Sequence, residues 1–261
     1  MNRIVKIGTW IALALMFVVL WGFTASEQSN KICEKLVVVI DQSNGNLFLN
    51  NQDIEISLRQ ENLHPVGKKI GSIDLNEIET KLDMIAEVKK ASVYKNLNGV
   101  VSIFIQQRTP IVRIMNANGT QFYLDEDGYQ MPLSDNYAPR VPVVTGHIND
   151  PGTQYSVSEI MKNEILAKTV KSDEVYKMVK YINKDKFWNA QIQQINFNRN
   201  DDIELIPTLG NHLIVFGDLE NMEPKFNKLK IFYTEGLNHL DWNAYDTINV
   251  KFRNQIVCTK K

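Results

Sequence analysis

The strongest hydrophobic pattern in the chain lies almost at its start, where residues 8–25 (GTWIALALMFVVLWGFTA) carry no charged side chain. In a helix that rises about 1.5 Å per residue, roughly 18 residues reach about 27 Å, close to the hydrocarbon thickness of a bilayer. The pattern therefore predicts a single transmembrane helix over residues 7–26. A cleaved secretory signal is the alternative, although this run is longer than the usual apolar core of a signal and offers only Thr24-Ala25-Ser26 as a cleavage site.

The charges around this run indicate its orientation. Arg3 and Lys6 precede it, and Glu27 is the first charge after it. Because positive charge stays on the cytoplasmic side of a membrane, residues 1–6 are expected inside the cell and the long remainder outside. With or without cleavage, the same domains are exported.

Strand-like patterns occur at both ends of the next region. Residues 36–40 (LVVVI) form a short β-branched run that predicts a strand, and residues 47–49 are a candidate for a brief second one. Further on, residues 88–94 and 100–105 are strand-like runs around the turn-forming Asn98-Gly99. These two runs predict a hairpin.

Two helices are expected between these strands. The first opens near Asn51 or Asp53 and stops before Pro65. The second has a stronger start signal, because Asp74 can cap it and Glu77 occupies the capping-box position. The predicted order is strand, helix, helix, strand, strand, which makes a small α+β unit.

Beyond residue 109 the pattern is mainly that of strands, with two amphipathic helices. Strand candidates occupy residues 111–115, 120–124, 129–131, 192–197, 202–206 and 212–216. One helix is expected to begin at Ser172 and another to run from Met222 to Tyr233, each with one apolar face. The chain is therefore predicted to be an α+β protein with a transmembrane helix, a small α+β unit, and a mixed β-domain whose extended sheet is flanked by helices.

The last segment of the chain alternates in a way that suits a strand at the border of a sheet. One side would carry Ile248, Val250, Phe252, Asn254, Ile256 and Cys258, and the other Asn249, Lys251, Arg253, Gln255 and Val257. The first side is fit for a core, whereas the second suits water or a partner that lies beside the strand. A break near Arg253-Asn254 would instead divide the segment into two strands.

The composition argues against nucleic acid as a partner and does not decide whether the chain contains a disulfide. The 29 lysine and arginine residues balance 30 acidic ones, so no strong overall field attracts the phosphate backbone of a nucleic acid. The two cysteines, Cys33 and Cys258, would form a bridge only if their α-carbons came within about 7 Å of each other. The sequence does not settle whether they pair.

Local signatures of catalysis are missing. The chain has no Gly-x-Ser-x-Gly, His-Glu-x-x-His, Walker or Gly-x-Gly-x-x-Gly pattern, and its four histidines lack metal-ligand spacing. Asp125-Glu126-Asp127-Gly128 does not have the spacing of a calcium loop, so we interpret it as a turn with solvated charges. The sequence predicts no enzyme, no cofactor, no metal site and no small-molecule substrate, and it assigns function to surfaces.

Several short runs carry a family resemblance through their order and spacing. Residues 88–93 (VKKASV), 99–105 and 107–110 (QRTP) resemble the POTRA domain of the FtsQ/DivIB family of bacterial division proteins. The likeness continues with Tyr123-Leu124-Asp125 and with residues 142–146 (PVVTG). The resemblance implies a linker at residues 27–35, a POTRA domain of order β-α-α-β-β at residues 36–109, and a β-domain at residues 110–261.

The same resemblance implies a binding surface. In this family, the terminal strands of the β-domain and basic residues on the neighbouring helix receive an acidic segment of the small division protein FtsB. Matched onto this chain, the implied partner contacts are Lys225 and Lys228 on the helix and Lys251, Phe252, Arg253, Gln255 and Val257 on the terminal strand. Two other roles suit these residue types, because lysines on an edge strand prevent unwanted pairing and periodic aromatics such as Phe252 are usually core.

The resemblance implies a non-enzymatic scaffold of the bacterial division complex, held in the cytoplasmic membrane at the division site. Its expected partners are FtsB-like and FtsL-like single-span proteins, bound by strand addition to a sheet edge, in a role that links divisome assembly to septal wall synthesis. One alternative is an envelope assembly or export factor that carries a POTRA unit. An anchored envelope hydrolase with a dispersed site is the other.

Overall fold

The computed structural model describes residues 10, 13, 15–17, 30–96, 98–151, 156–163, 170–237 and 242–261. The chain folds as two compact units, Met1–Gln107 (unit 1) and Arg108–Lys261 (unit 2). Most of the transmembrane helix predicted at residues 7–26 lies outside the described residues. Within the described part of the chain, no helix has both the length and the apolar character needed to cross a bilayer.

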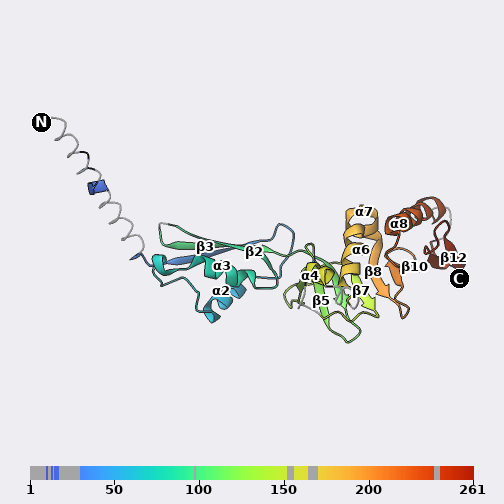
Figure 1. Ribbon diagram of the computed structural model, residues 1–261, viewed down its shortest axis with the longest axis horizontal. Helices are drawn as coiled ribbons and strands as arrows, with labels where there is room; N and C mark the ends of the chain where they lie inside the picture. The colour runs from blue at the N-terminus through green and yellow to red at the C-terminus, as the bar shows by residue number, and fades with distance from the viewer. Residues whose placement is uncertain are drawn as a thin grey trace. The chain divides into compact units, whose positions relative to one another are not determined.

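Unit 1 is an α+β fold in which helices α2 and α3 lie on one face of a three-stranded sheet (Figure 1). Its elements are β1 (Lys35–Asp41), α2 (Asn51–Gln60), the short 3₁₀ helix η1 (Ile70–Ser72), α3 (Leu75–Asp83), β2 (Val88–Lys95) and β3 (Val100–Gln107). The strand order is β1-β3-β2, with β1 parallel and β2 antiparallel to β3, so β1 and β2 form the two edges. The predicted order of strand, helix, helix, strand, strand is confirmed.

Capping residues start both helices of unit 1 where the sequence predicts. The Asn50 side chain accepts the N–H groups of Gln52 and Asp53, and that of Asp74 accepts the N–H of Glu77. The predicted strand at residues 47–49 is wrong, because this segment forms no strand and instead leads into α2. Its apolar side chains serve the core, since Phe48 is only 1% exposed.

In its described residues, unit 2 is built on a nine-stranded mixed sheet with the order β12-β11-β10-β9-β8-β7-β4-β5-β6. The strands are β4 (Pro110–Met115), β5 (Gln121–Asp125), β6 (Gln130–Met131), β7 (Val143–Gly146), β8 (Ile192–Phe197), β9 (Ile203–Pro207), β10 (Leu213–Gly217), β11 (Tyr245–Asn249) and β12 (Val257–Lys260). The helices are α4 (Val157–Lys162), α6 (Ser172–Lys184), α7 (Lys186–Gln191), α8 (Met222–Ile231) and the π-helical turn η2 (Phe232–Gly236). A mixed α+β fold with a large sheet flanked by helices is thus confirmed.

One continuous hydrophobic core joins the sheet of unit 2 to α6, α7 and α8. The positions of these helices beside the strands can be followed in Figure 1. Val179 of α6, Trp188 of α7 and Phe226 of α8 are all buried in it, and the Trp188 ring centroid lies 5.2 Å from that of Phe226. Ile214 of β10 and Ile248 of β11 are buried in the same cluster. The helices therefore hold the end of the sheet that carries β10, β11 and β12 through direct packing.

A buried ion pair stabilises the start of unit 2. Arg108 Nη1 lies 2.9 Å from Asp125 Oδ2, with side-chain exposures of 13% and 0%, and the Arg108 guanidinium stacks 4.1 Å above the Tyr129 ring. The other Asp125 oxygen accepts the N–H groups of Asp127 and Tyr129. Our interpretation of residues 125–128 as a turn with solvated charges is therefore wrong for Asp125, whose charge is buried and paired.

Both cysteines are free thiols. Cys33 is buried in unit 1, and Cys258 is half-buried in β12, where burial raises the pKa of its thiol. The two residues belong to different units.

Candidate partner-binding edge

The terminal segment forms two antiparallel strands at one end of the large sheet. β11 pairs with β10 in parallel, and β12 turns back to pair with β11. The single long strand suggested by the alternation is wrong, and the alternative of a break near Arg253-Asn254 is the arrangement that the structure adopts. The alternation fails at Phe252, which is 47% exposed because the chain leaves the sheet after Val250.

Among the described strands, none pairs with the outer side of β12, so this strand is an edge of the sheet. Val257 is 43% exposed, and Thr259 and Lys260 are exposed as well. An edge strand presents unpaired N–H and C=O groups that an extended peptide can satisfy. The geometry therefore suits the addition of one more strand.

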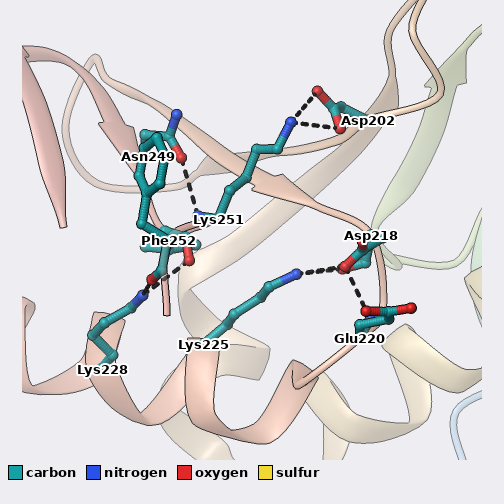
Figure 2. Close-up of polar contacts among 9 residues, drawn as sticks. Asp202, Asp218, Glu220, Lys225, Lys228, Asn249, Lys251 and Phe252 are labelled. Carbon is teal, nitrogen blue, oxygen red and sulfur yellow. Dashed lines mark hydrogen bonds and ion pairs between the residues drawn. The ribbon is translucent and has the colours of Figure 1, made fainter. Parts of the chain in front are cut away.

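Lys228 of α8 holds the connection between β11 and β12 (Figure 2). Its ammonium donates to the carbonyl oxygens of Val250 at 3.0 Å, Gln255 at 3.1 Å and Phe252. Burial lowers the pKa of Lys228, and the neighbouring positive charge of Lys225 adds to this effect. An ammonium has three N–H donors, so these three contacts use all of them. Lys228 therefore affects β12 indirectly, by fixing the loop that precedes it.

Replacing Lys228 with methionine is expected to loosen β12 while leaving the rest of unit 2 folded. Methionine keeps an apolar stem of similar length but leaves three carbonyl groups without their charged donor, at a cost of about 1–3 kcal/mol in the free energy of unfolding. Amide exchange measured by NMR should accelerate from Val257 to Lys260. The matched control is Lys230→Met on the same helix, because Lys230 pairs with Asp185 at 2.6 Å. Equal exchange rates in both variants would contradict the role assigned to Lys228.

Lys225, the other predicted helix residue, is buried and tied to the loop after β10 (Figure 2). It is 7% exposed, and its ammonium lies 2.7 Å from the Asp218 carboxylate and 5.1 Å from the centre of the Phe216 ring. This hydrogen bond lowers the pKa of Asp218 below its usual range. Lys225 therefore fastens the N-terminal part of α8 to β10 rather than facing solvent.

Lys251 crosses from the end of β11 to the turn before β9. Its ammonium lies 2.7 and 2.9 Å from the two carboxylate oxygens of Asp202, and its backbone N–H donates to Asn249 Oδ1 at 3.0 Å (Figure 2). The lysine stem passes over Gly217, where a β-carbon would lie 2.8 Å from Lys251 Cγ. The φ of +83° at Gly217 also favours glycine, so this position leaves room for the lysine.

The remaining predicted residues lie on the connection and on β12. Phe252, Arg253 and Gln255 are exposed between the two strands, and Val257 is exposed at the start of β12. Arg253 has no ion-pair partner among the residues that the structure describes. The structure thus brings all seven predicted residues to one end of the sheet, where these four and Lys251 are exposed, Lys228 is half-buried and Lys225 is buried. A direct contact between any of them and a partner stays a prediction.

The prediction of the site missed the groups that hold the lysines. Asp218 pairs with Lys225 and Asp202 with Lys251 from other segments of the chain, and no local pattern links either carboxylate to its lysine. Asn249 accepts the N–H of Lys251 two residues later, which is a local contact. The positive φ of Gly217 is the one feature that the sequence signals weakly, as a glycine directly after an apolar strand. In the described part of the chain, no group of three or more His, Cys, Asp or Glu residues could hold a metal ion.

Comparisons with known proteins agree with the division of the chain into two parts. Residues 109–259, more than half of the chain, match the family model described as FtsQ/DivIB, C-terminal related. Residues 31–106 match the model of a POTRA-like domain. A comparison with curated proteins found no match.

Proposed function

This chain belongs to the FtsQ/DivIB family, and from that membership we propose that it is a non-enzymatic scaffold of the bacterial division complex. Residues 7–26 would anchor it in the cytoplasmic membrane at the division site, with residues 1–6 inside the cell. The POTRA domain at residues 36–109 would help to recruit it, and the β-domain at residues 110–261 would bind FtsB-like and FtsL-like single-span proteins. Through these partners it would link divisome assembly to septal wall synthesis.

The observation that carries this proposal is the open outer side of β12. A partner segment in extended conformation would add a tenth strand, and its main-chain groups would pair with those of β12. Ile256 and Cys258 pack against the core of unit 2, so the edge is held in place before a partner arrives. Such preorganisation lowers the entropy cost of binding.

Charge near this edge favours an acidic partner. Arg253 precedes β12 and Lys260 is its last residue, and both side chains are exposed. The ammonium of Lys251 forms an ion pair with Asp202, so it contributes less net attraction to an acidic partner. An acidic segment would gain modest affinity and a faster association rate from these charges.

The charge part of the proposal is tested by Arg253→Glu. Binding of a synthetic peptide with the acidic segment of the FtsB-like partner should weaken about fivefold or more at low salt, because an attraction of roughly 1 kcal/mol at the rim becomes a repulsion. The difference should shrink in high salt, which screens exposed charges. Arg140→Glu, the same charge change at an exposed residue between β6 and β7, is the control and should leave affinity unchanged. Equal affinity for Arg253→Glu and the parent at low salt would remove Arg253 from the site.

A further inference from the structure

The segment that precedes β1 is fastened to unit 1 by backbone contacts. The N–H of Cys33 donates to the carbonyl oxygen of Lys68 at 2.8 Å, and Ile32 forms an isolated antiparallel bridge with Lys69. Cys33 itself is buried. Residues 30–34 therefore belong to the folded part of unit 1.

The same segment contacts the turn between β2 and β3, so these parts lie at one end of the sheet. The N–H of Glu34 donates to the carbonyl oxygen of Gly99 at 2.9 Å. A β-carbon on Gly99, whose φ is +83°, would lie 2.9 Å from the carbonyl oxygen of Ile32. β1 and β3 are parallel and both begin at this end, whereas Gln107, the last residue of β3, lies at the opposite end.

We call residues 30–35, 65–74 and 95–99 the basic end of unit 1. Its lysines are all exposed: Lys31, Lys35, Lys68, Lys69 and Lys95. Its acidic residues are Glu34 and Asp74, and the side chain of Asp74 caps α3. Two apolar side chains, Ile32 and Val66, are 55% and 41% exposed beside the lysines. The basic end thus combines net positive charge with exposed apolar groups.

Three of these lysines form hydrogen bonds with neutral groups, which do not cancel their charge. Lys69 Nζ lies 3.2 Å from Asn30 Oδ1, and Lys95 Nζ donates to the carbonyl oxygen of Ile70 at 3.0 Å. Lys68 donates to a backbone carbonyl oxygen, that of Asn62. Their positive charge therefore stays available to an external anion.

The basic end is also close in sequence to the proposed membrane anchor. Three residues, 27–29, separate that anchor at residues 7–26 from Asn30. From residue 26 to residue 30 a chain reaches at most about 14 Å, and the headgroup layer beyond the hydrocarbon is about 6 Å thick. Asn30 would then lie no more than about 8 Å beyond the headgroups, which is about one Debye length at physiological salt.

We propose that the basic end of unit 1 docks on the membrane surface and binds anionic phospholipid headgroups. This proposal rests on the proposed function, which supplies the anchor. The lysines lie at the level of the lipid phosphates, and Ile32 and Val66 enter the interfacial layer. Because Gln107 is at the other end of β3, docking holds unit 1 with its exit to unit 2 away from the bilayer surface.

The test uses the full chain in lipid nanodiscs that contain some phosphatidylcholine with a spin-labelled headgroup. One set of discs is otherwise phosphatidylcholine alone, and the other adds phosphatidylglycerol. Paramagnetic relaxation of the backbone amides of Val66 and Asn98, measured by NMR, should be at least about threefold stronger in the anionic discs, and high salt should reduce the difference. Asn30 should be relaxed in both discs, because the anchor alone keeps it near the lipid.

Charge variants test the lysines directly. Lys68→Gln with Lys69→Gln should lower the relaxation of Val66 in anionic discs at least about threefold, because glutamine keeps a hydrogen-bond donor but has no charge. The matched control is Lys89→Gln with Lys90→Gln, the same change in charge at the start of β2, beside the Gln107 end of β3. This control should behave like the parent.

The outcomes separate docking from anchoring. Equal relaxation of Val66 in neutral and anionic discs, with Asn30 relaxed in both, would overturn docking and leave the anchor in place. Undiminished relaxation in a folded Lys68 and Lys69 double variant would also overturn docking. If that variant does not fold, the comparison of the two discs with the parent chain decides. Asn30 without relaxation in either disc would overturn the anchor, and docking with it.

Discussion

Removing residues 256–261 is expected to lower the affinity for the acidic FtsB-like segment that we propose as the partner at least 100-fold. The deletion takes away β12 and its open edge, together with the Ile256 and Cys258 side chains that pack on the core. It keeps the carbonyl groups of Val250, Phe252 and Gln255, so the contacts of Lys228 are preserved. Binding is measured by fluorescence anisotropy of the labelled peptide.

A matched control separates the backbone of β12 from its charge. Lys260→Gln with Lys261→Gln keeps every residue of the strand and should lose less than tenfold in affinity, because exposed charges at a rim contribute little. Circular dichroism and the exchange of amides in unit 1 should be the same in the deletion and the parent. Full binding by the deletion variant would show that the partner uses another surface.

Arg108→Ala is expected to cost about 3–5 kcal/mol in the free energy of unfolding of unit 2, because it leaves Asp125 buried without its charged partner. The loss of the stacking contact with Tyr129 adds to the effect. Trp188 is fully buried in unit 2, and Trp242 lies in the same unit, so the change in tryptophan fluorescence of the chain during urea denaturation reports this unfolding.

The ion pair between Lys251 and Asp202 in the same unit provides the comparison. Its side chains are 41% and 26% exposed, so Lys251→Ala should cost no more than about 1 kcal/mol. A loss for Arg108→Ala as small as that for Lys251→Ala would contradict the view that the buried pair stabilises the start of unit 2.

Local signals predicted most elements of this fold correctly. The capping residue Asp74 and the apolar spacing of Ile78 and Leu82 located α3, and the spacing of Val175, Val179 and Ile182 located α6. Such signals depend on neighbours within one or two turns of helix, which the sequence contains in full.

The errors arose where contacts between distant segments decide. Alternation continues from Ile248 through Cys258, yet the chain leaves the sheet after Val250. The carbonyl groups of Val250, Phe252 and Gln255 in this segment accept hydrogen bonds from Lys228 of α8. The residues next to Asp125 are polar and indicate a solvated turn. In the structure the Asp125 carboxylate is buried and paired with Arg108, which lies 17 residues earlier in the chain. Neither partner is visible from local pattern.

The dependence on distant contacts also explains why the sequence did not show which site residues face solvent. The family resemblance pointed to residues at the β12 end of the sheet, and Phe252, Arg253 and Gln255 are exposed there, while their contact with a partner stays a prediction. It did not distinguish Lys225 and Lys228, whose ammonium groups are used within the chain, from lysines that face solvent. Burial of a lysine depends on acceptors such as Asp218, which only the fold brings close.

The most direct test of the account is a site-specific photo-crosslinking scan in living cells, with the photoreactive residue placed in turn from residue 247 to residue 260 and at Arg140 as the distant control. Each crosslinked position on the partner is then mapped by mass spectrometry. Strand addition to β12 predicts crosslinks to one single-span partner. When the photoreactive residue is moved by two residues along β12, the crosslinked position on the partner should also move by two residues. Crosslinks that stay at one partner residue, or that form only from Arg140, would contradict it.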